Sequence, residues 1–74
     1  MKQITLQQRV GDSLRKHREA LGISQEAFAE KVHMHRTYYS AIERGEKNVT
    51  LGTLNRVCDG LGAPVWEVLK EAEQ

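Results

Sequence analysis

The side chains best suited to recognition chemistry lie in the stretch 24–45, SQEAFAEKVHMHRTYYSAIERG. In its second half, small polar and basic side chains fall within about 140° of arc on one helix face, at about 100° per residue. The members of this face are Arg36, Thr37, Ser40, Ala41 and Arg44. Such a face fits the major groove of DNA, where a guanidinium can grip a guanine through two hydrogen bonds. We therefore expect Arg36, Thr37 and Ala41 to contact bases.

A second set of side chains is expected to contact the DNA backbone, because phosphate contacts fix the register of a protein without reading sequence. Its members are Tyr38, Ser40, Arg44, Lys47 and Asn48. Tyr38 lies beside the reading face. Lys47 and Asn48 lie in the loop that follows the reading helix, where they are placed to touch sugar and phosphate.

Two short helices joined by a tight turn are predicted to present these side chains. The first spans about 25–32 and follows Ser24, whose hydroxyl can accept a hydrogen bond from an otherwise free backbone N–H. The second begins near His35 and ends at Gly45, a residue suited to a left-handed helix cap. Its inward face is expected to consist of Tyr39, Ile42 and Glu43.

The pattern S-Q-E-x-x-A at 24–29, followed by S-x-x-E-x-G at 40–45, resembles the helix-turn-helix of the phage repressor and Cro family. The run HRTYYSAIERGEKNVT at 35–50 is similar to the restriction–modification controller proteins in particular. The resemblance covers nearly the whole chain. It implies an all-α fold, a compact five-helix lambda-repressor-like DNA-binding domain over residues 1–74.

The resemblance also implies roles for single residues. Gln25 is expected to support the contact with the DNA backbone. Arg18 is expected to pair with Glu43 and so to tie the first helix of the fold to the reading helix. His33 departs from the family pattern, because it occupies a place where glycine or asparagine commonly takes positive φ. Histidine tolerates that conformation better than most residues, but it should cost free energy.

Three further helices complete the predicted fold, at about 6–21, 51–61 and 64–72. Thr5 and Gln8 form a T-x-x-Q capping box before the first, Thr50 caps the second, and Pro64 opens the third. The apolar stripes expected to face the core are Leu6, Val10, Leu14, His17 and Leu21, then Leu51, Leu54, Val57, Cys58 and Leu61, then Val65, Val68, Leu69 and Ala72.

Trp66 is expected to lie outside that core, about 100° around its helix from Val65. A large aromatic side chain left outside a core is a candidate interface anchor. A domain of 74 residues is marginally stable alone and gains from a partner. We therefore expect a homodimer with Trp66, Val65 and Leu69 at its interface. The alternative is that Trp66 folds back over the 6–21 helix as a lid within the chain.

The net charge of the chain is only +1, but its distribution is uneven. Residues 1–48 hold nine Lys or Arg and six Asp or Glu, a balance of +3, whereas residues 49–74 have a balance of −2. Positive charge therefore lies with the predicted reading half. No apolar run approaches the ~20 residues of a membrane span, and the N-terminus lacks the apolar segment of a signal peptide. With Cys58 as the single cysteine, we expect a cytoplasmic protein without a membrane partner.

These observations predict a sequence-specific transcriptional regulator that binds a palindromic operator as a homodimer. The resemblance to controller proteins implies control of restriction-enzyme expression, with activation at low operator occupancy and repression at high occupancy. One alternative is a phage or toxin–antitoxin repressor of the same fold. Another is a protein-interaction module, which predicts an acidic or apolar outer face on the 35–45 helix.

Catalysis and cofactors are not expected. The aspartates and histidines are few and scattered, and the sequence has no glycine-rich phosphate loop. The two histidines in His33-Met34-His35 are a weak signal for a metal site, because no cysteine or carboxylate lies beside them. We therefore predict neither an enzyme nor a resident metal.

Overall fold

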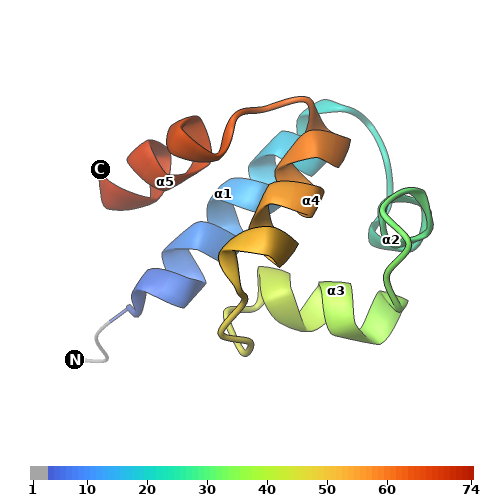
Figure 1. Ribbon diagram of the computed structural model, residues 1–74, viewed down its shortest axis with the longest axis horizontal. Coiled ribbons are helices and arrows are strands. Elements are labelled where there is room, and N and C mark those ends of the chain that lie inside the picture. The colour runs from blue at the N-terminus through green and yellow to red at the C-terminus, as the bar shows by residue number, and fades with distance from the viewer. Residues whose placement is uncertain (1–3) are drawn as a thin grey trace.

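The computed structural model describes residues 4–74, which form five helices (Figure 1). Their bounds are α1 Leu6–Ala20, α2 Gln25–Lys31, α3 Arg36–Glu43, α4 Leu51–Leu61 and α5 Val65–Glu73. The predicted all-α, five-helix class is confirmed. The domain predicted over 1–74 includes residues 1–3, which lie outside the described residues. Among those that are described, no helix is both long enough and apolar enough to cross a membrane.

Short side chains at the helix starts fix where α1, α2 and α4 begin. The Gln8 N–H donates to Thr5 Oγ1 at 3.1 Å while the Gln8 side chain accepts from the Thr5 N–H at 2.9 Å. Ser24 Oγ accepts from the Ala27 N–H at 3.1 Å. Thr50 Oγ1 accepts from the Thr53 N–H at the same distance. Each bond satisfies a backbone donor that the helix itself leaves free, and the three predicted caps are confirmed.

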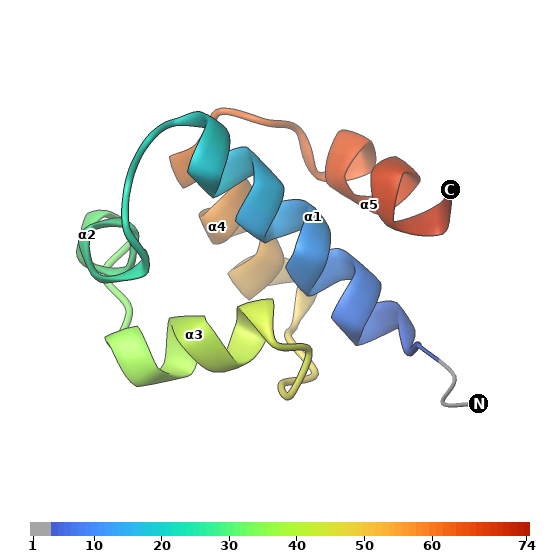
Figure 2. The ribbon, with the colours of Figure 1, turned by 180° about the vertical axis from the view of Figure 1, so that it is seen from behind.

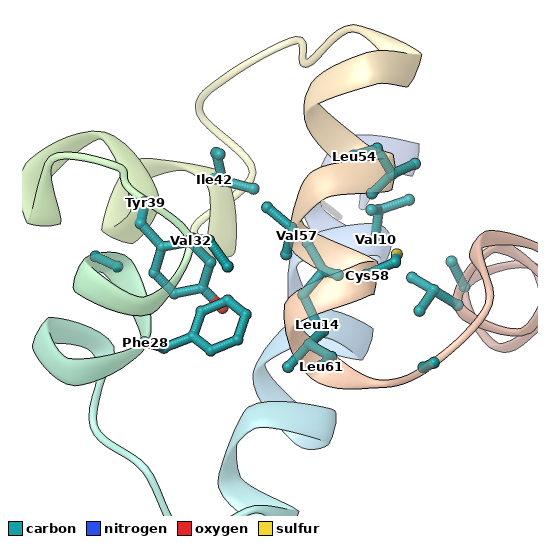
Figure 3. Close-up of a cluster of buried hydrophobic side chains, with 14 residues drawn as sticks. Val10, Leu14, Phe28, Val32, Tyr39, Ile42, Leu54, Val57, Cys58 and Leu61 are labelled. Atoms are coloured by element: carbon teal, nitrogen blue, oxygen red, sulfur yellow. The ribbon is translucent and has the colours of Figure 1, made fainter.

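One hydrophobic core joins all five helices (Figure 3). Its largest fully buried side chains are Tyr39, Phe28, Leu14, Val57, Val68 and Cys58. The Phe28 and Tyr39 rings lie with centroids 5.0 Å apart and planes tilted by 54°, so α2 and α3 are joined by an aromatic contact. This contact sets the two predicted recognition helices against each other.

Three leucines of the predicted inward stripes are exposed instead, and these predictions are wrong. Leu6 is the first residue of α1, Leu51 is the first residue of α4, and Leu21 follows the last residue of α1. Helical periodicity places each of them on the stripe, but it does not say how far along the helix a neighbour packs. The exposed leucines therefore mark helix ends that extend beyond the core.

The helix α1 lies between α3 and α5. In both views, α3 runs along the lower edge and α5 along the upper edge (Figures 1 and 2). At its crossing with α3, α1 has Gly11, where a Cβ would lie only 2.3 Å from the backbone oxygen of Glu43. The absent side chain at this position lets α1 support α3 closely from behind.

Candidate nucleic-acid interface

The turn between α2 and α3 is held in one geometry by backbone hydrogen bonds. The His33 N–H donates to the Glu30 carbonyl at 3.1 Å, and the Met34 N–H donates to the Ala29 carbonyl at 2.8 Å. This pair of bonds is the Schellman motif, which requires a left-handed residue at the first position after the helix cap. His33 is that residue, with φ of 59°, the conformation common at this position of the family. Met34 then packs against the core and fixes the start of α3.

The two sides of α3 differ sharply in exposure. Tyr39, Ile42 and Glu43 are buried, as predicted. Arg36, Thr37, Tyr38 and Arg44 are exposed, Ser40 is half-buried, and Lys47 and Asn48 are exposed in the following loop. Because α3 lies at the edge of the molecule, its exposed side can approach a large ligand without hindrance (Figure 1).

Ala41 does not belong to the exposed side of α3, and its placement on the reading face is wrong. Its exposed fraction is only 5%, so its methyl group cannot reach a base edge. Helical periodicity places Ala41 on the outer arc, but the packing around α3 leaves its side chain buried. At the end of α3, the Gly45 N–H donates to the Ile42 carbonyl at 3.0 Å and the Glu46 N–H donates to the Ala41 carbonyl at 2.9 Å, so the backbone turns away from the helix there.

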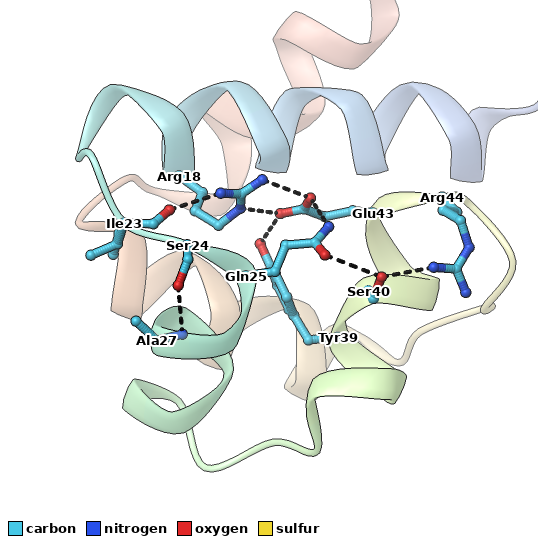
Figure 4. A network of polar contacts seen from close by, with 9 residues as sticks. All are labelled: Arg18, Ile23, Ser24, Gln25, Ala27, Tyr39, Ser40, Glu43 and Arg44. Atoms are coloured by element: carbon cyan, nitrogen blue, oxygen red, sulfur yellow. Dashed lines mark hydrogen bonds and ion pairs between the residues drawn. The ribbon is translucent and has the colours of Figure 1, made fainter.

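A buried carboxylate fixes the inner side of α3 (Figure 4). Arg18 donates Nε to Glu43 Oε2 at 2.7 Å and Nη2 to Oε1 at 3.2 Å. The Tyr39 hydroxyl donates to Oε2 at 2.5 Å, and Gln25 Nε2 donates to Oε1 at 2.7 Å. Each carboxylate oxygen therefore accepts two hydrogen bonds. Arg18 also donates Nη1 to the Ile23 carbonyl at 2.7 Å, which joins α1, the 21–24 loop, α2 and α3 at one point.

The hydrogen bonds of this cluster stabilise the charged form of Glu43. Burial alone would raise the pKa of the Glu43 carboxyl, but the donors of Arg18, Tyr39 and Gln25 outweigh burial and hold that pKa below its usual value. The same contact raises the pKa of Arg18. Burial, followed by the adjacent carboxylate, raises the pKa of the Tyr39 hydroxyl, so this hydroxyl keeps its proton and remains a donor.

A chain of polar contacts leads from the buried carboxylate to the surface. Ser40 Oγ donates to Gln25 Oε1 at 3.2 Å, and Arg44 Nη1 donates to Ser40 Oγ at 2.7 Å. Gln25 thus bonds Glu43 on one side and Ser40 on the other. Its amide nitrogen carries a second N–H, because a carboxamide has two donors. The network therefore sets the direction of Gln25, Ser40 and Arg44, three predicted contacts to the DNA backbone.

Sequence reasoning missed the acidic neighbours of the two exposed arginines. Arg36 Nη1 lies 3.5 Å from a carboxylate oxygen of Glu26, and Arg44 Nη2 lies 3.0 Å from one of Glu46. Exposed pairs of this kind contribute little stability and are readily exchanged for other partners. The S-Q-E pattern placed Glu26 on the first turn of α2, but only the angle between α2 and α3 brings it near Arg36.

The predicted dimer residues on α5 differ from one another in environment. Trp66 is 65% exposed, so it lies outside the core as predicted, and a side chain this exposed does not form a lid over α1. Val65 and Leu69 are half-buried and pack against the core. The outer surface of α5 therefore presents the exposed Trp66, together with the half-buried Val65 and Leu69.

Residues 9–70 match a family model described as a helix-turn-helix domain. The chain is 42% identical to Control protein C.MunI of a Mycoplasma species, over 89% of this chain and 90% of that one. A solved structure of the clp gene regulator ClgR from C. glutamicum is 38% identical, with a TM-score of 0.90, over 93% of this chain and 88% of that one. A tetramer of the restriction–modification controller protein C.Esp1396I, solved in complex with its natural 35 base-pair operator, is 33% identical. Its TM-score is 0.83, with 97% of this chain and 100% of that chain covered.

The fold and the α2–α3 unit thus define a helix-turn-helix domain. The chain belongs to the helix-turn-helix family and, within it, to the control proteins of restriction–modification systems.

Proposed function

We propose that this protein is a sequence-specific transcriptional regulator that binds a palindromic DNA operator as a homodimer. The observation that best supports this proposal is the difference between the inner and outer sides of α3. Its inner side is fixed by the Arg18–Glu43 pair at 2.7 Å, while its outer side presents exposed basic and polar groups at the edge of the molecule. A rigidly supported helix with such a face suits insertion into a major groove.

The contacts divide into base reading and positioning. Arg36 and Thr37, on the first turn of α3, read base edges, and Arg36 grips a guanine through two hydrogen bonds. The positioning set on phosphates is Gln25, Tyr38, Ser40, Arg44, Lys47 and Asn48. Ala41 is left out of the base-reading set because it is buried. On binding, a guanine base replaces Glu26 as the partner of Arg36, and a DNA phosphate replaces Glu46 as the partner of Arg44.

A homodimer is supported by the exposed Trp66 and by the similarity to C.Esp1396I, which is a tetramer on its operator DNA. In our proposal, α5 of each copy meets α5 of the other, and each α3 enters one half-site. A two-fold axis then requires half-sites about 34 Å apart, one turn of the double helix.

The family membership supports control of restriction–modification genes, with activation at low operator occupancy and repression at high occupancy. The similarity to ClgR, a clp gene regulator, keeps open a second candidate, a regulator of other cellular genes with the same DNA-binding mode. The two candidates differ in the genes controlled and not in the mechanism of recognition. We propose no catalytic role for this chain.

Selection of bound duplexes from a random DNA library tests the proposal. We expect enrichment of a palindrome whose half-sites repeat after about one helical turn. Enrichment of a single, unrepeated site would contradict the dimer. Recovery of no common sequence would contradict sequence-specific recognition. The position of the selected palindrome, beside restriction–modification genes or elsewhere, then distinguishes the two candidates.

A further inference from the structure

A second cluster of functional groups lies between α1 and α5, away from the reading face. His17 Nε2 lies 2.6 Å from Glu71 Oε1 and 3.9 Å from Glu67 Oε2. One nitrogen and two carboxylate oxygens from these residues all lie within 4.8 Å of one another. Glu67 and Glu71 are one helical turn apart on α5, so both face His17 on α1. Residues about fifty positions apart in sequence meet here only because α1 and α5 pack together.

The charge of this cluster is unbalanced. Among residues 4–74, no Lys or Arg nitrogen is paired with either carboxylate, and the imidazole is the partner they share. Nearby basic side chains on α1 are engaged elsewhere. Arg9 Nε donates to the Ala72 carbonyl at 2.9 Å, and Lys16 Nζ lies 3.2 Å from Asp12. Two carboxylates held together beside one imidazole favour an added cation.

We propose that His17, Glu67 and Glu71 form a binding site for a divalent transition metal of the Zn²⁺ type, which fastens α5 to α1. An imidazole nitrogen selects Zn²⁺, Co²⁺ or Ni²⁺ over Mg²⁺ or Ca²⁺, which prefer oxygen ligands throughout. The sequence alone predicts no metal here, because these three residues come from two helices whose crossing the sequence does not reveal.

The dimensions of the cluster suit such an ion. Zn²⁺ binds nitrogen and carboxylate oxygen at about 2.0–2.2 Å, so two tetrahedral ligands lie about 3.4 Å apart. The distance from His17 to Glu71 must open from 2.6 Å, and that from His17 to Glu67 must close from 3.9 Å. Rotation of the two glutamate side chains achieves both changes, because they are 43% and 45% exposed. Water completes the coordination from the solvent side.

The consequence for the molecule is a restraint on α5. His17 is only 21% exposed and is fixed on α1, the helix that also supports α3. The metal therefore ties the outer helix to the centre of the fold. Trp66 is adjacent to Glu67, so its fluorescence reports on an ion at this site.

Titration of the metal-free protein with ZnCl₂, followed by thermal unfolding, tests the proposal. We expect the melting temperature to rise by about 4–8 °C when free Zn²⁺ reaches roughly five times its dissociation constant. Titration with CoCl₂ should produce visible absorption bands and quench Trp66 emission. Both signals should saturate at the same Co²⁺ concentration. Glu67→Gln should raise the dissociation constants for Zn²⁺ and Co²⁺ about tenfold or more, since a direct ligand matters at least as much for metal affinity as its supporting residues.

Two controls keep the test decisive. Glu67→Gln should fold, because Glu67 lies 3.9 Å from His17, beyond hydrogen-bond distance. His35→Gln removes a histidine before α3 whose side chain makes no cap bond, and it should leave the metal response unchanged. A melting temperature independent of Zn²⁺ would overturn the proposal and leave only the contact between His17 and Glu71. An equal response in the wild type and Glu67→Gln, or its loss in His35→Gln, would place the ion elsewhere and also overturn it.

Discussion

The two sides of α3 illustrate two different uses of polar residues. On the inner side, the Glu43 carboxylate accepts four hydrogen bonds from Arg18, Tyr39 and Gln25, and both charged residues are less than 10% exposed. On the outer side, Arg36 has one exposed carboxylate partner at 3.5 Å. A buried, fully satisfied charge is costly to disturb, whereas an exposed pair is exchanged at little cost. The inner side should therefore govern stability and orientation, and the outer side should govern recognition.

The largest expected effect comes from breaking the inner side. Glu43→Ala leaves the Arg18 guanidinium buried without its carboxylate, and we expect a loss of about 3–5 kcal/mol in the free energy of unfolding. This is a large share of the stability of a small domain. Denaturant titration measures the loss.

A double-mutant cycle checks that the loss belongs to the pair. Arg18→Leu combined with Glu43→Leu should recover much of the stability, because no stranded charge remains. If the stability losses of the two single variants simply add in the double variant, the Arg18–Glu43 pair does not account for the loss in Glu43→Ala.

A substitution of Trp66 on α5 touches neither side of α3. Truncating an aromatic anchor commonly costs at least about 2 kcal/mol of binding free energy, so Trp66→Ala should weaken dimerisation about thirtyfold or more. Operator affinity should fall with no change in the preferred bases. Sedimentation measures the dimer, and the emission of wild-type Trp66 should shift to longer wavelength on dilution through dissociation. An unchanged dimer would exclude Trp66 from the interface.

Gly11 tests whether close support by α1 positions α3. A Cβ at residue 11 would lie 2.3 Å from the Glu43 carbonyl oxygen and 2.6 Å from that of Ile42, so Gly11→Ala must push the helices apart. We expect a loss of about 1–3 kcal/mol in the free energy of unfolding. Gly52→Ala is the matched control, since its nearest neighbour is Thr50 Oγ1 at 3.9 Å. In that open helical position, alanine should stabilise by about 0.5–1 kcal/mol.

A smaller effect is expected from pH. The folded-state pKa of Glu43 is below its usual value of 4.5, so the charged form adds stability above pH 4.5, and this stability is lost as pH falls through the folded value. The stability difference between the wild type and Glu43→Gln should therefore narrow below pH 4.5. Asp12 and Glu46 also have lowered pKa values, but they are common to both proteins and cancel. A difference that stays constant down to about pH 3 would contradict the charged-state account.

The sequence predicted best what depends on neighbours along the chain. The caps at Thr5, Ser24 and Thr50 each use a hydroxyl and a backbone N–H three residues away, so local rules were enough. The left-handed His33 followed from a family position in the turn. The identities of Arg18 and Glu43 came from the resemblance, whereas the donors Tyr39 and Gln25 emerged only from the packing of α1, α2 and α3.

The predictions failed where the exposure of a side chain depends on how the helices pack against one another. Ala41 is on the arc of the outer side, yet the packed fold buries its side chain. Leu51 is on the inner stripe of α4, yet its side chain is exposed because the first turn extends beyond the core. The cluster of His17, Glu67 and Glu71 depends on the crossing of α1 and α5, which no local pattern reveals.

If the outer side of α3 reads bases, Arg36→Ala should change which sequence the protein prefers. Affinity should be measured for the selected operator and for random DNA at several salt concentrations, with Lys47→Ala as the matched control. Arg36→Ala should cost about 1–3 kcal/mol on the operator and relax the preference at one base position. Lys47→Ala should weaken both DNAs alike and lower the salt slope by about one. An equal loss on both DNAs for Arg36→Ala would reduce Arg36 to a phosphate contact and contradict base reading by the outer side of α3.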